Sequence, residues 1–360
     1  MSDDDKGMTY SDAGVVSLES EDTFGTLLHW VNKSLEGRPE VRAEVGLYAT
    51  VIEVAPNLGI AVTTDGVGTK LLVAELMDKY DTVGIDCVAM NVNDLVCVGA
   101  RPLAMVDYIA VENARDPLLG EVGRGLYEGA RLADISIPAG EVAQLKEMIK
   151  GVREDKGFDL VGTAIGTVEL DRMITGEGIC EGDAVVGVSS SGLHSNGYTL
   201  ARKVLLDRYG VDARLEELGM TVGEALLEPT RIYVRPTLEV LRKVKGVRAL
   251  VHITGDGFRN LRRVRSEVGF VLDALPEPPP LFRVIQKEGK VGNAEMANTF
   301  NLGVGMCVVV EDSRADEVKE VFHGHGMEAF RMGFARPDAE REIEIPGLSV
   351  RGRKDRFYEV

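Results

Sequence analysis

A short glycine-containing turn in the first third of the chain has the residue types of a nucleotide–metal site. Asp65-Gly66-Val67-Gly68-Thr69-Lys70 directly follows the apolar run 59–64. Glycine lets the backbone approach a ligand closely and present successive N–H groups to it. Lys70 adds a positive charge, Thr69 a hydroxyl and Asp65 a carboxylate that can bind a metal. The spacing is not that of a Walker A motif, so a tight strand-to-helix turn with a surface lysine is an equally good interpretation.

A second candidate site lies on the next expected helix, Thr82 to Val98, which is apolar on nearly every face. Such a helix is normally buried, yet it contains Asn91 and Asp94, three residues apart on one face. An unpaired buried carboxylate is costly, so Asp94 needs a metal, a lysine or a polar cavity. We favour a metal ion shared by Asp65 and Asp94. The alternative is a carboxylate that caps N–H groups of another element.

Two loops in the second half repeat this arrangement. Ser190 to Gly197 (SSGLHSNG) follows the strand-like run 184–189 and precedes a helix, and His252 to Gly257 (HITGDG) again ends a strand and opens a helix. Small hydroxyl, amide and glycine residues at a helix N-terminus are typical of anion sites. Each loop carries a histidine, His194 or His252, which suits phosphate or ribose recognition with a proton-transfer group. Each loop alone is equally well an ordinary helix cap.

Charge and composition limit the classes of function. The chain has 360 residues, enough for two domains, and 41 basic against 58 acidic side chains give a net charge of −17. That charge argues against nucleic acid or a membrane as a partner, because both demand a positive surface. A phosphorylated small molecule remains compatible, since Mg²⁺ bridges carboxylates to phosphates. The apolar runs are too short for a membrane span, and four cysteines without a CxxC pair favour a reducing, cytoplasmic location.

The order of expected elements is that of an α/β protein with two domains. Strand-like and helix-like segments alternate in both halves, and the polar, glycine-rich segment 171–182 separates them. We therefore expect an N-terminal domain at 1–170 and a C-terminal α/β domain at 183–360. Strands are expected at 59–64, 103–111, 159–170, 184–189, 247–254 and 302–310; helices at 71–79, 82–98, 117–133 (capped by Asp116), 198–209, from Phe258 onward and at 314–323; and long or stiff loops at 140–157 and 276–280.

Taken together, the motifs resemble those of the phosphoribosylformylglycinamidine cyclo-ligase family, also called aminoimidazole ribonucleotide synthetases. The matches run in the family's order over nearly the whole chain: YSDAGV (10–15), DGVGTK (65–70), GIDCVAMNVNDLVCVGARPL (84–103), SGLHSNGY (191–198), LLEPTRIYV (226–234), HITGDGF (252–258) and TFNLGVGM (299–306). One such string is a weak signal, whereas seven in order are highly specific.

The resemblance implies a homodimer of two α/β domains per chain, in which N-terminal strands of both partners form a barrel at the dimer interface, with ATP nearby. It also implies ATP-dependent ring closure of formylglycinamidine ribonucleotide to aminoimidazole ribonucleotide in purine biosynthesis, with release of ADP and phosphate. ATP would activate the formyl amide oxygen, and a metal and a lysine would stabilise charge on the phosphoryl oxygens. Mg²⁺ is the expected metal, and a requirement for K⁺ is left open.

The family's functional residues can be carried over onto matching positions. Asp65 and Asp94 are the expected Mg²⁺ ligands. Contacts with ATP are expected from Asp65, Gly66, Gly68, Thr69, Lys70, Asn91, Asp94 and Glu141. Contacts with the ribonucleotide or the reacting groups are expected from Ser191, Gly192, His194, Ser195, Asn196, His252, Thr254 and Gly255. The candidates for catalysis are His194, His252 and Lys70.

The chain departs from the family pattern in two loops. Around Gly140 to Gln144 the family usually has GGETAEM, so that Glu141 keeps its position but its neighbours differ, and Asp256 stands in a loop that is usually GGG. An extra carboxylate beside an anion site is unfavourable unless it points away or binds a cation. Two rival functions remain open: a kinase of the same superfamily, such as thiamine monophosphate kinase, and an inactive nucleotide-binding or scaffold subunit.

Overall fold

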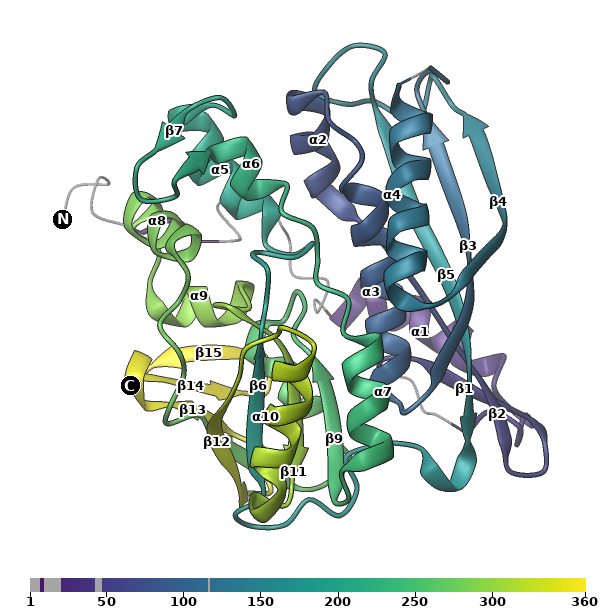
Figure 1. Cartoon of the computed structure of the whole chain (residues 1–360), viewed down its shortest axis with the longest axis vertical. Coiled ribbons are helices and arrows are strands. Elements are labelled where there is room, and N and C mark those ends of the chain that lie inside the picture. Colours follow the sequence, from purple (N-terminus) through teal and green to yellow (C-terminus); the bar gives the residue numbers. More distant parts are fainter. Residues whose placement is uncertain (1–6, 10–20, 43–46, 116) are drawn as a thin grey trace.

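The structure of the protein is a computed structural model that describes residues 7–9, 21–42, 47–115 and 117–360. The YSDAGV segment at 10–15 and the cap expected at Asp116 lie outside these residues. Figure 1 shows two halves side by side, each with its own main sheet and its own helices. The two-domain mixed α/β architecture expected from the sequence is therefore confirmed. Within the described ranges, no helix has the length and apolar character needed to cross a membrane.

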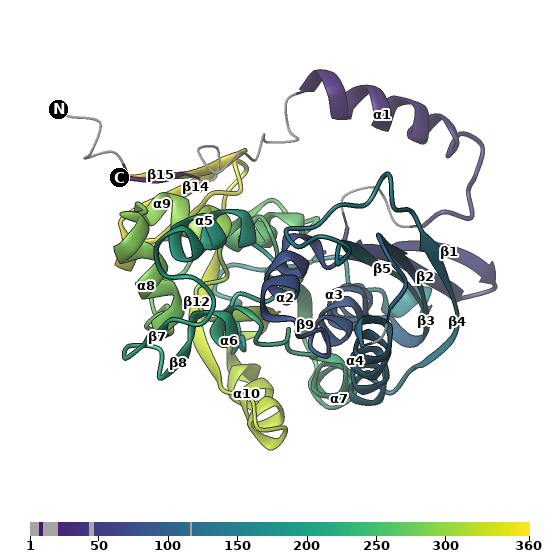
Figure 2. The same cartoon turned by 90° about the horizontal axis from the view of Figure 1, so that it is seen from above.

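The N-terminal half is built on a sheet whose described strands follow the order β1-β2-β5-β3-β4. These strands are β1 (Thr50–Ala55), β2 (Leu58–Gly66), β3 (Arg101–Val111), β4 (Ser136–Gln144) and β5 (Phe158–Glu169). Helices α3 (Val83–Cys97) and α4 (Leu118–Ala133) cover one face of the sheet, and α2 (Leu71–Met77) follows the 65–70 turn. Figure 2 shows α1 (Glu21–Lys33) set apart from both halves.

The two faces of this sheet differ in what covers them. Residues of β5 alternate between the faces, as expected for a strand with one side on a core. Leu160 and Ala164 are fully buried on the α3 side, whereas Ile165 is 40% exposed. Pairing with β3 puts Val106 and Tyr108 on the same open face, and both are exposed. Within one chain the described strands thus form an open sheet with an apolar outer face, not a closed barrel.

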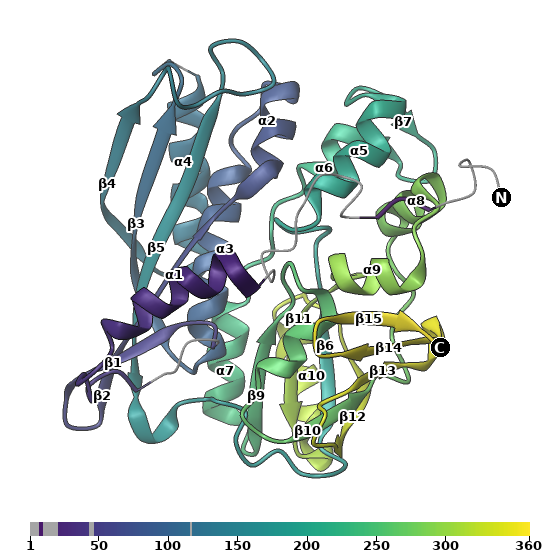
Figure 3. The same ribbon diagram turned by 180° about the vertical axis from the view of Figure 1, so that it is seen from behind.

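The C-terminal half has a larger main sheet, in the order β15-β14-β13-β10-β12-β6-β11-β9. Its strands are β6 (Ala184–Ser189), β9 (Val247–His252), β10 (Val268–Val271), β11 (Val304–Val310), β12 (Ala329–Pro337), β13 (Ile343–Ile345), β14 (Val350–Arg353) and β15 (Arg356–Glu359). Its helices are α5 (Tyr198–Tyr209), α6 (Val222–Leu226), α7 (Val234–Lys243), α8 (Pro280–Gly289), α9 (Asn293–Thr299) and α10 (Ala315–Gly324), with a small hairpin of β7 (Arg214–Leu215) and β8 (Met220–Thr221). Edge strand β9 lies nearest the N-terminal half (Figure 3).

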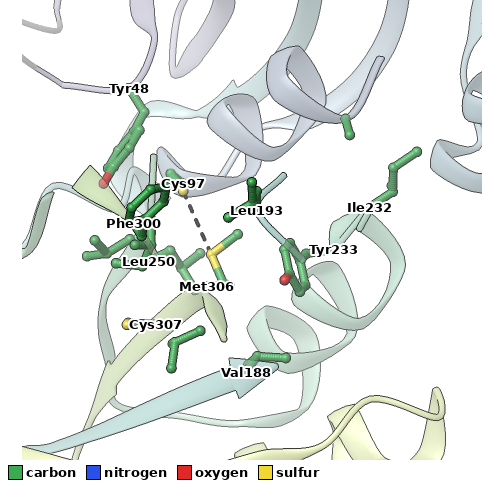
Figure 4. Packing of buried hydrophobic residues seen from close by; sticks show 14 of the residues in the cluster. Tyr48, Cys97, Val188, Leu193, Ile232, Tyr233, Leu250, Phe300, Met306 and Cys307 are labelled. Atoms are coloured by element: carbon green, nitrogen blue, oxygen red, sulfur yellow. Dashed lines mark hydrogen bonds between the residues drawn. The ribbon is translucent and has the colours of Figure 1, made fainter. Parts of the chain in front are cut away.

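Helix α3 joins the two halves. It packs under the N-terminal sheet and beside α4, and it also contacts β9 and α7 of the C-terminal half. Its Cys97 sulfur lies 4.0 Å from the sulfur of Met306 on β11, and Tyr48, Leu193 and Leu250 lie around this contact (Figure 4). These side chains are buried in one continuous apolar core. Elements that end at this boundary can therefore hold polar side chains of both halves in fixed positions.

The expected elements are largely found, with three corrections. Residues 140–144 belong to β4, which pairs in parallel with β3, and do not begin a loop. This edge strand is exposed on both faces, so it lacks the alternation that would reveal it. After the HITGDG segment the chain forms a 3₁₀ helix, Gly257–Arg263, instead of an α-helix. The sequence prediction also lacked the strands β1, β7, β8, β10 and β12–β15 and the helices α1 and α6–α9.

Candidate functional site

The 65–70 turn begins where β2 ends, at the boundary between the halves. Gly68 has a φ of +73°, a conformation that favours glycine. The Asp65 carboxylate accepts a hydrogen bond from the Gly66 N–H at 2.8 Å, and the Asn91 amide of α3 donates to the Asp65 carbonyl at 3.1 Å. Thr69 is exposed in the same turn. The structure therefore brings the turn and the polar face of α3 together, as the sequence predicts.

Two buried polar residues of α3 form hydrogen bonds with the C-terminal half. Asp86 accepts from the backbone N–H and the hydroxyl of Thr230 at 2.7 and 2.6 Å. Asn93 donates to the Arg231 carbonyl and accepts from the Tyr233 N–H, both at 2.9 Å. Asp86 and Asn93 of this otherwise apolar helix thus connect the two halves by hydrogen bonds.

Asp94, near the C-terminal end of α3, pairs with His252 at the end of β9. The distance from Asp94 Oδ1 to His252 Nδ1 is 2.8 Å, so Nδ1 carries the ring proton when the carboxylate is ionised. The Tyr48 O–H donates to the His252 carbonyl at 2.9 Å and holds the backbone of the same residue. His252 is fully buried, and its Nε2 has no hydrogen-bond partner among the described residues. Because such groups are normally paired, Nε2 is available for a ligand.

The charge of Asp94 acts on Asp65. Burial raises the pKa of Asp65 to about 6, and the negative charge of Asp94 adds to the rise, while the Gly66 N–H, His252 and Arg263 act in the opposite direction. The ionised form of Asp65 is thus disfavoured in the ligand-free protein. A cation between the two carboxylates would favour the ionised forms of both.

The donor atoms at this place suit a hard divalent cation. Asp65 and Asp94 offer carboxylate oxygens, and the buried Oδ1 of Asn91 has no hydrogen-bond partner in the described part of the chain. Across the described ranges, no group of three or more histidine, cysteine, aspartate or glutamate side chains is arranged to hold a metal. Mg²⁺ needs no such group, because it binds through one or two carboxylates and takes its other ligands from phosphates and water. The residues therefore fit Mg²⁺.

Lys70 is fully buried, and its ammonium group is engaged within the protein. Nζ lies 2.9 and 2.8 Å from the two carboxylate oxygens of Asp86, 2.6 Å from the Glu228 carbonyl and 3.2 Å from the His194 carbonyl. Burial lowers the pKa of Lys70, and the charge of Asp86 opposes that change. An ammonium has three protons, and protein acceptors take all of them, so this geometry does not support the contact with an ATP phosphate that the sequence predicts for Lys70.

His194 is also fully buried, with a distinct environment from His252. The Ser191 N–H lies 3.4 Å from His194 Nε2, so Nε2 accepts and Nδ1 holds the proton. Burial, followed by the charges of His252, Lys70 and Arg231, lowers the pKa of His194 well below its usual value. The ring therefore stays neutral, and its centroid lies 6.4 Å from that of His252. Nδ1 of His194, like Nε2 of His252, has no hydrogen-bond partner among the described residues, so the proton transfer expected from the sequence stays a prediction for His194.

The 191–197 and 254–257 loops lie side by side in the C-terminal half. A Cβ atom added to Gly255 would come within 3.2 Å of Asn196 Oδ1, so the backbone of one loop faces a side chain of the other. Ser195 Oγ lies 3.2 Å from the hydroxyl of a neighbouring threonine, and Thr254 Oγ1 lies 3.3 Å from Asn260 Oδ1. The structure thus brings together the polar groups of both loops.

The beginning of the first loop is held by hydrogen bonds with other segments. The Ser191 hydroxyl donates to the Pro229 carbonyl at 2.5 Å. The carbonyl of buried Gly192 accepts from Ser190 and Asn301 at 3.0 and 2.9 Å. Ser191 itself remains partly exposed, whereas Ser190 and Gly192 on either side of it are buried.

Asp256, the extra carboxylate of the second loop, is paired with two arginines. Its oxygens lie 2.6 Å from Arg259 and 3.4 Å from Arg263. The carboxylate therefore binds cationic side chains, which is one of the two ways in which its charge was expected to be tolerated.

Glu141 lies away from these residues. It is exposed on edge strand β4 and pairs in register with Tyr108 of β3. The same row continues through Val161 of β5 to Gly66 of β2. Three inter-strand spacings separate Glu141 from Gly66, or about 14 Å. Within one chain the structure does not bring Glu141 to the 65–70 turn.

Comparison with known proteins agrees with both halves of the molecule. Two family models match, the AIR synthase related protein N-terminal domain over residues 46–168 and its C-terminal domain over residues 181–345. The phosphoribosylformylglycinamidine cyclo-ligase of Methanothermobacter thermautotrophicus is 46% identical over 317 residues, covering 87% of this chain and 91% of its own. That of Methanocaldococcus jannaschii is 44% identical over 350 residues, covering 96% of both chains. The chain belongs to the phosphoribosylformylglycinamidine cyclo-ligase family.

Membership of the cyclo-ligase family makes the chain an enzyme of the ligase class. Solved structures with a similar fold include AaThiL complexed with AMPPCP and TMP, with a TM-score of 0.60 at 15% identity over 95% of this chain and 97% of that one. They also include thiamine-monophosphate kinase from Stenotrophomonas maltophilia K279a, with a TM-score of 0.60 at 17% identity over 89% and 96%. At such identities the likeness concerns the fold alone, so the kinase alternative has much weaker support.

In this cyclo-ligase the sequence motifs did not reveal the roles of Tyr48, Asp86 and Arg263. Asp86 carried a signal, because it is a second carboxylate on an apolar helix. Tyr48 and Arg263 carried none. The Arg263 guanidinium lies 4.9 Å from the Tyr48 ring centroid, and Tyr48 in turn bonds to His252, which is 204 positions away. Contacts at such separations arise only from the tertiary fold.

Proposed function

We propose that this chain uses ATP to close the imidazole ring of formylglycinamidine ribonucleotide, a step of purine biosynthesis, at the boundary between its two halves. The observation that carries the proposal is that α3 links Asp65, Asp94 and His252: its Asn91 donates to the Asp65 carbonyl at 3.1 Å, and its Asp94 bonds to His252 at 2.8 Å. The three linked residues come from β2, α3 and β9 and join a turn of the N-terminal half to a loop of the C-terminal half. This arrangement suits a reaction that needs a nucleotide and a second substrate at one place.

The proposed reaction proceeds in two balanced steps. The γ-phosphoryl group of ATP moves to the formyl amide oxygen, and ADP is released. The amidine-side nitrogen then attacks the activated carbon, a C–N bond forms, and the C–O bond breaks with phosphate as the leaving group. The attacking nitrogen and the formyl amide nitrogen each give up one proton. A proton shift from the methylene carbon to the imino nitrogen then completes the aromatic ring of aminoimidazole ribonucleotide. Phosphorylation replaces a poor leaving group by a good one, and the protein must position the reactants and stabilise phosphoryl charge.

The ATP side of the proposed site consists of the 65–70 turn and the polar face of α3. The backbone N–H of Gly68 and the Thr69 hydroxyl are assigned to the phosphates, and Gly66, whose N–H is bonded to Asp65, lets the backbone approach them closely. Asp65 and Asp94 would hold Mg²⁺, with Asn91 beside them, and the bound ion would supply positive charge to the phosphate oxygens. Two solved structures of similar fold are complexed with AMPPCP, which supports a nucleotide as a ligand of this fold. Lys70 and Glu141 are left out of the phosphate contacts, and no residue is assigned to K⁺.

The proton-handling group in this proposal is His252. Asp94 fixes the proton on Nδ1, which leaves Nε2 as a lone-pair acceptor buried at the boundary. Nε2 can accept the proton that the attacking nitrogen loses when the ring closes. The ribonucleotide faces the adjacent loops, where we assign contacts to Ser191, Gly192, Ser195, Asn196, Thr254 and Gly255.

We also propose that the enzyme is a homodimer that uses the outer face of the N-terminal sheet. Val106, Tyr108 and Ile165 are about two-fifths exposed on that face, and a sheet face of this kind normally packs against another layer. A second copy would place two such faces together and so form the barrel expected for the family. Light scattering should give twice the chain mass for the protein. Val106→Asp should give a monomer, whereas Tyr127→Asp on exposed α4 should leave the dimer intact.

The proposed domain limits are 1–170 and 183–360, with 171–182 as a linker. The free cysteines Cys87, Cys97, Cys180 and Cys307 suit a reducing compartment, and we propose a cytoplasmic location.

The decisive experiment measures ADP release by the purified chain with Mg²⁺ and ATP. Release should depend on formylglycinamidine ribonucleotide and should match the aminoimidazole ribonucleotide formed, one for one. Nucleotide binding without substrate-dependent ADP release would instead indicate the inactive scaffold subunit. ADP release with thiamine monophosphate as the acceptor would indicate the kinase.

A further inference from the structure

The lysine of the 65–70 turn makes contacts that its sequence motif does not suggest. Its side chain is completely buried, and Nζ meets the Asp86 carboxylate and the carbonyls of His194 and Glu228 within 3.2 Å. The ammonium nitrogen of Lys70 also lies 5.7 Å from the centre of the aromatic ring of Tyr198, which is the first residue of α5. A buried lysine with this many partners has no free proton and no path to solvent.

These contacts cross the boundary between the halves. Lys70 and Asp86 belong to the N-terminal half, whereas His194 and Glu228 belong to the C-terminal half. Asp86 adds two more bonds across the boundary, to the N–H and hydroxyl of Thr230 at 2.7 and 2.6 Å. The buried ion pair of Lys70 and Asp86 therefore connects the 191–197 and 228–230 segments to the 65–70 turn, which begins at Asp65.

The 191–197 loop has a backbone that needs such a restraint. His194 has a φ of +62°, in the left-handed region that residues with side chains rarely adopt. Its carbonyl is the one that Lys70 holds, and its ring nitrogen receives the Ser191 N–H at 3.4 Å. Strained backbone conformations persist only where surrounding groups determine them. Lys70 thus acts on the middle of the loop that carries Ser191, Ser195 and Asn196.

We propose that Lys70 and Asp86 form a clamp between the halves, and that Lys70 is a positioning residue for the 191–197 loop instead of a phosphate ligand. The proposal rests on the proposed function only in assigning that loop to the ribonucleotide. The clamp sets the distance between the nucleotide side and the substrate side, so its loss separates the reactants while the nucleotide still binds.

The test compares Lys70→Met, Asp86→Asn and the double variant Lys70→Met/Asp86→Leu. For each, calorimetry measures the Kd of AMPPCP with Mg²⁺, kinetics give kcat and KM, and hydrogen exchange follows residues 191–197. Lys70→Met should lower kcat about 10- to 100-fold, the range for loss of a positioning group, and should speed exchange of the loop. The AMPPCP Kd should stay within about threefold. Since both members act as a unit, the double variant should lose no more than Lys70→Met alone.

Two further variants keep the test decisive. Lys70→Arg keeps the positive charge but has a planar group that does not match three acceptors around one nitrogen. A clamp predicts a lower kcat and faster loop exchange for it, with nucleotide binding retained. Lys79→Met is the control, because Lys79 is exposed just beyond α2 and pairs with Asp81. It should leave kcat, the AMPPCP Kd and the loop exchange unchanged.

The opposite pattern overturns the clamp. A tenfold or larger rise in the AMPPCP Kd of Lys70→Met, with exchange of 191–197 unchanged and Asp86→Asn fully active, would make Lys70 a phosphate ligand. A wild-type chain without ring closure would overturn the proposed function, and the binding and exchange measurements would still decide the clamp.

Discussion

The two ends of α3 carry the same residue type in different surroundings. At the N-terminal end, Asp86 is completely buried and bonds to Lys70 and Thr230. At the C-terminal end, the side chain of Asp94 is 13% exposed, bonds to His252 and acts electrostatically on Asp65. Asp86 is paired with a lysine and a threonine, whereas Asp94 has one partner, His252, within the described part of the chain and lies near a second carboxylate.

This difference indicates how a single apolar helix can serve both structure and chemistry. A buried ion pair with additional hydrogen bonds fixes geometry, and removal of one member leaves an uncompensated charge. Two neighbouring carboxylates disfavour each other's ionised form unless a cation is bound between them. Asp86 therefore suits docking of the halves, and Asp94 suits a ligand site.

Asp94→Asn should abolish most of the activity without harming the fold. The asparagine oxygen can still accept from His252 Nδ1, but the charge needed by a metal is gone. Turnover should fall about 10²- to 10³-fold, as on removal of one strong electrostatic group from an active site. The Mg²⁺ concentration for half-maximal activity should rise. The ligand-free melting temperature should hold or increase, because repulsion with Asp65 is removed.

The matched variant is Asp86→Asn, at the other end of the same helix. It should lower the ligand-free melting temperature, because Lys70 loses its counter-charge, and should leave the Mg²⁺ dependence unchanged. If Asp94→Asn behaves in this way instead, Asp94 is a structural residue and does not belong to the metal site.

Asn93→Ala should reduce stability and spare the chemistry. Asn93 is fully buried between Asp94 and the C-terminal half, and its loss leaves the Arg231 carbonyl and the Tyr233 N–H without their partner. We expect a loss of about 2–6 kcal/mol in the free energy of unfolding, because each of the two buried groups without a partner costs about 1–3 kcal/mol. Urea unfolding measures it, with exposed Asn32→Ala as the control. A change below about 1 kcal/mol would show that water replaces the lost bonds.

Much of the fold followed from sequence patterns. Alternating strand and helix segments were sufficient for the two-domain class, and the apolar α3 with its polar face was recognisable. The partners of the polar residues were not. Lys70 lies in a motif that resembles phosphate-binding turns. That its side chain is buried becomes evident only in the fold, where the 228–230 segment packs against it. Likewise, Asp94 meets a histidine 158 positions away, and β4 lacks any periodicity because both of its faces are exposed.

The pH dependence of stability should reveal the strain on Asp65. Its pKa of about 6 in the folded protein lies above the usual 3.8, so the folded state holds the proton more tightly than the unfolded state does. The stability from this group is complete below about pH 4 and is lost as the pH rises through 6. The loss is at most about 3 kcal/mol for two pKa units. Urea unfolding from pH 4 to 8 without metal measures it.

Asp65→Asn is the matched variant for this measurement. The difference in unfolding free energy between the wild-type protein and the variant should change across pH 4–7 and then stay constant. Adding Mg²⁺ and AMPPCP at pH 7 should stabilise the wild-type protein much more than the variant. A difference that is the same at all pH values would mean that Asp65 titrates normally and that Asp94 does not act on it.

Asp256→Gly should have the smallest effect, although Asp256 lies in a loop that borders the proposed site. Its carboxylate is 43% exposed and pairs with Arg259 and Arg263, and ion pairs of this exposure contribute about 0–1 kcal/mol. Arg263 keeps its contact with the Tyr48 ring, and Tyr48 keeps its bond to the His252 carbonyl. Turnover should therefore stay within about threefold and the free energy of unfolding within about 1 kcal/mol. A tenfold change in turnover would mean that the exposed Asp256 helps to position His252 through Arg263 and Tyr48. The degree of burial would then not be enough to distinguish a carboxylate that docks the two halves, such as Asp86, from one that acts in the site, such as Asp94.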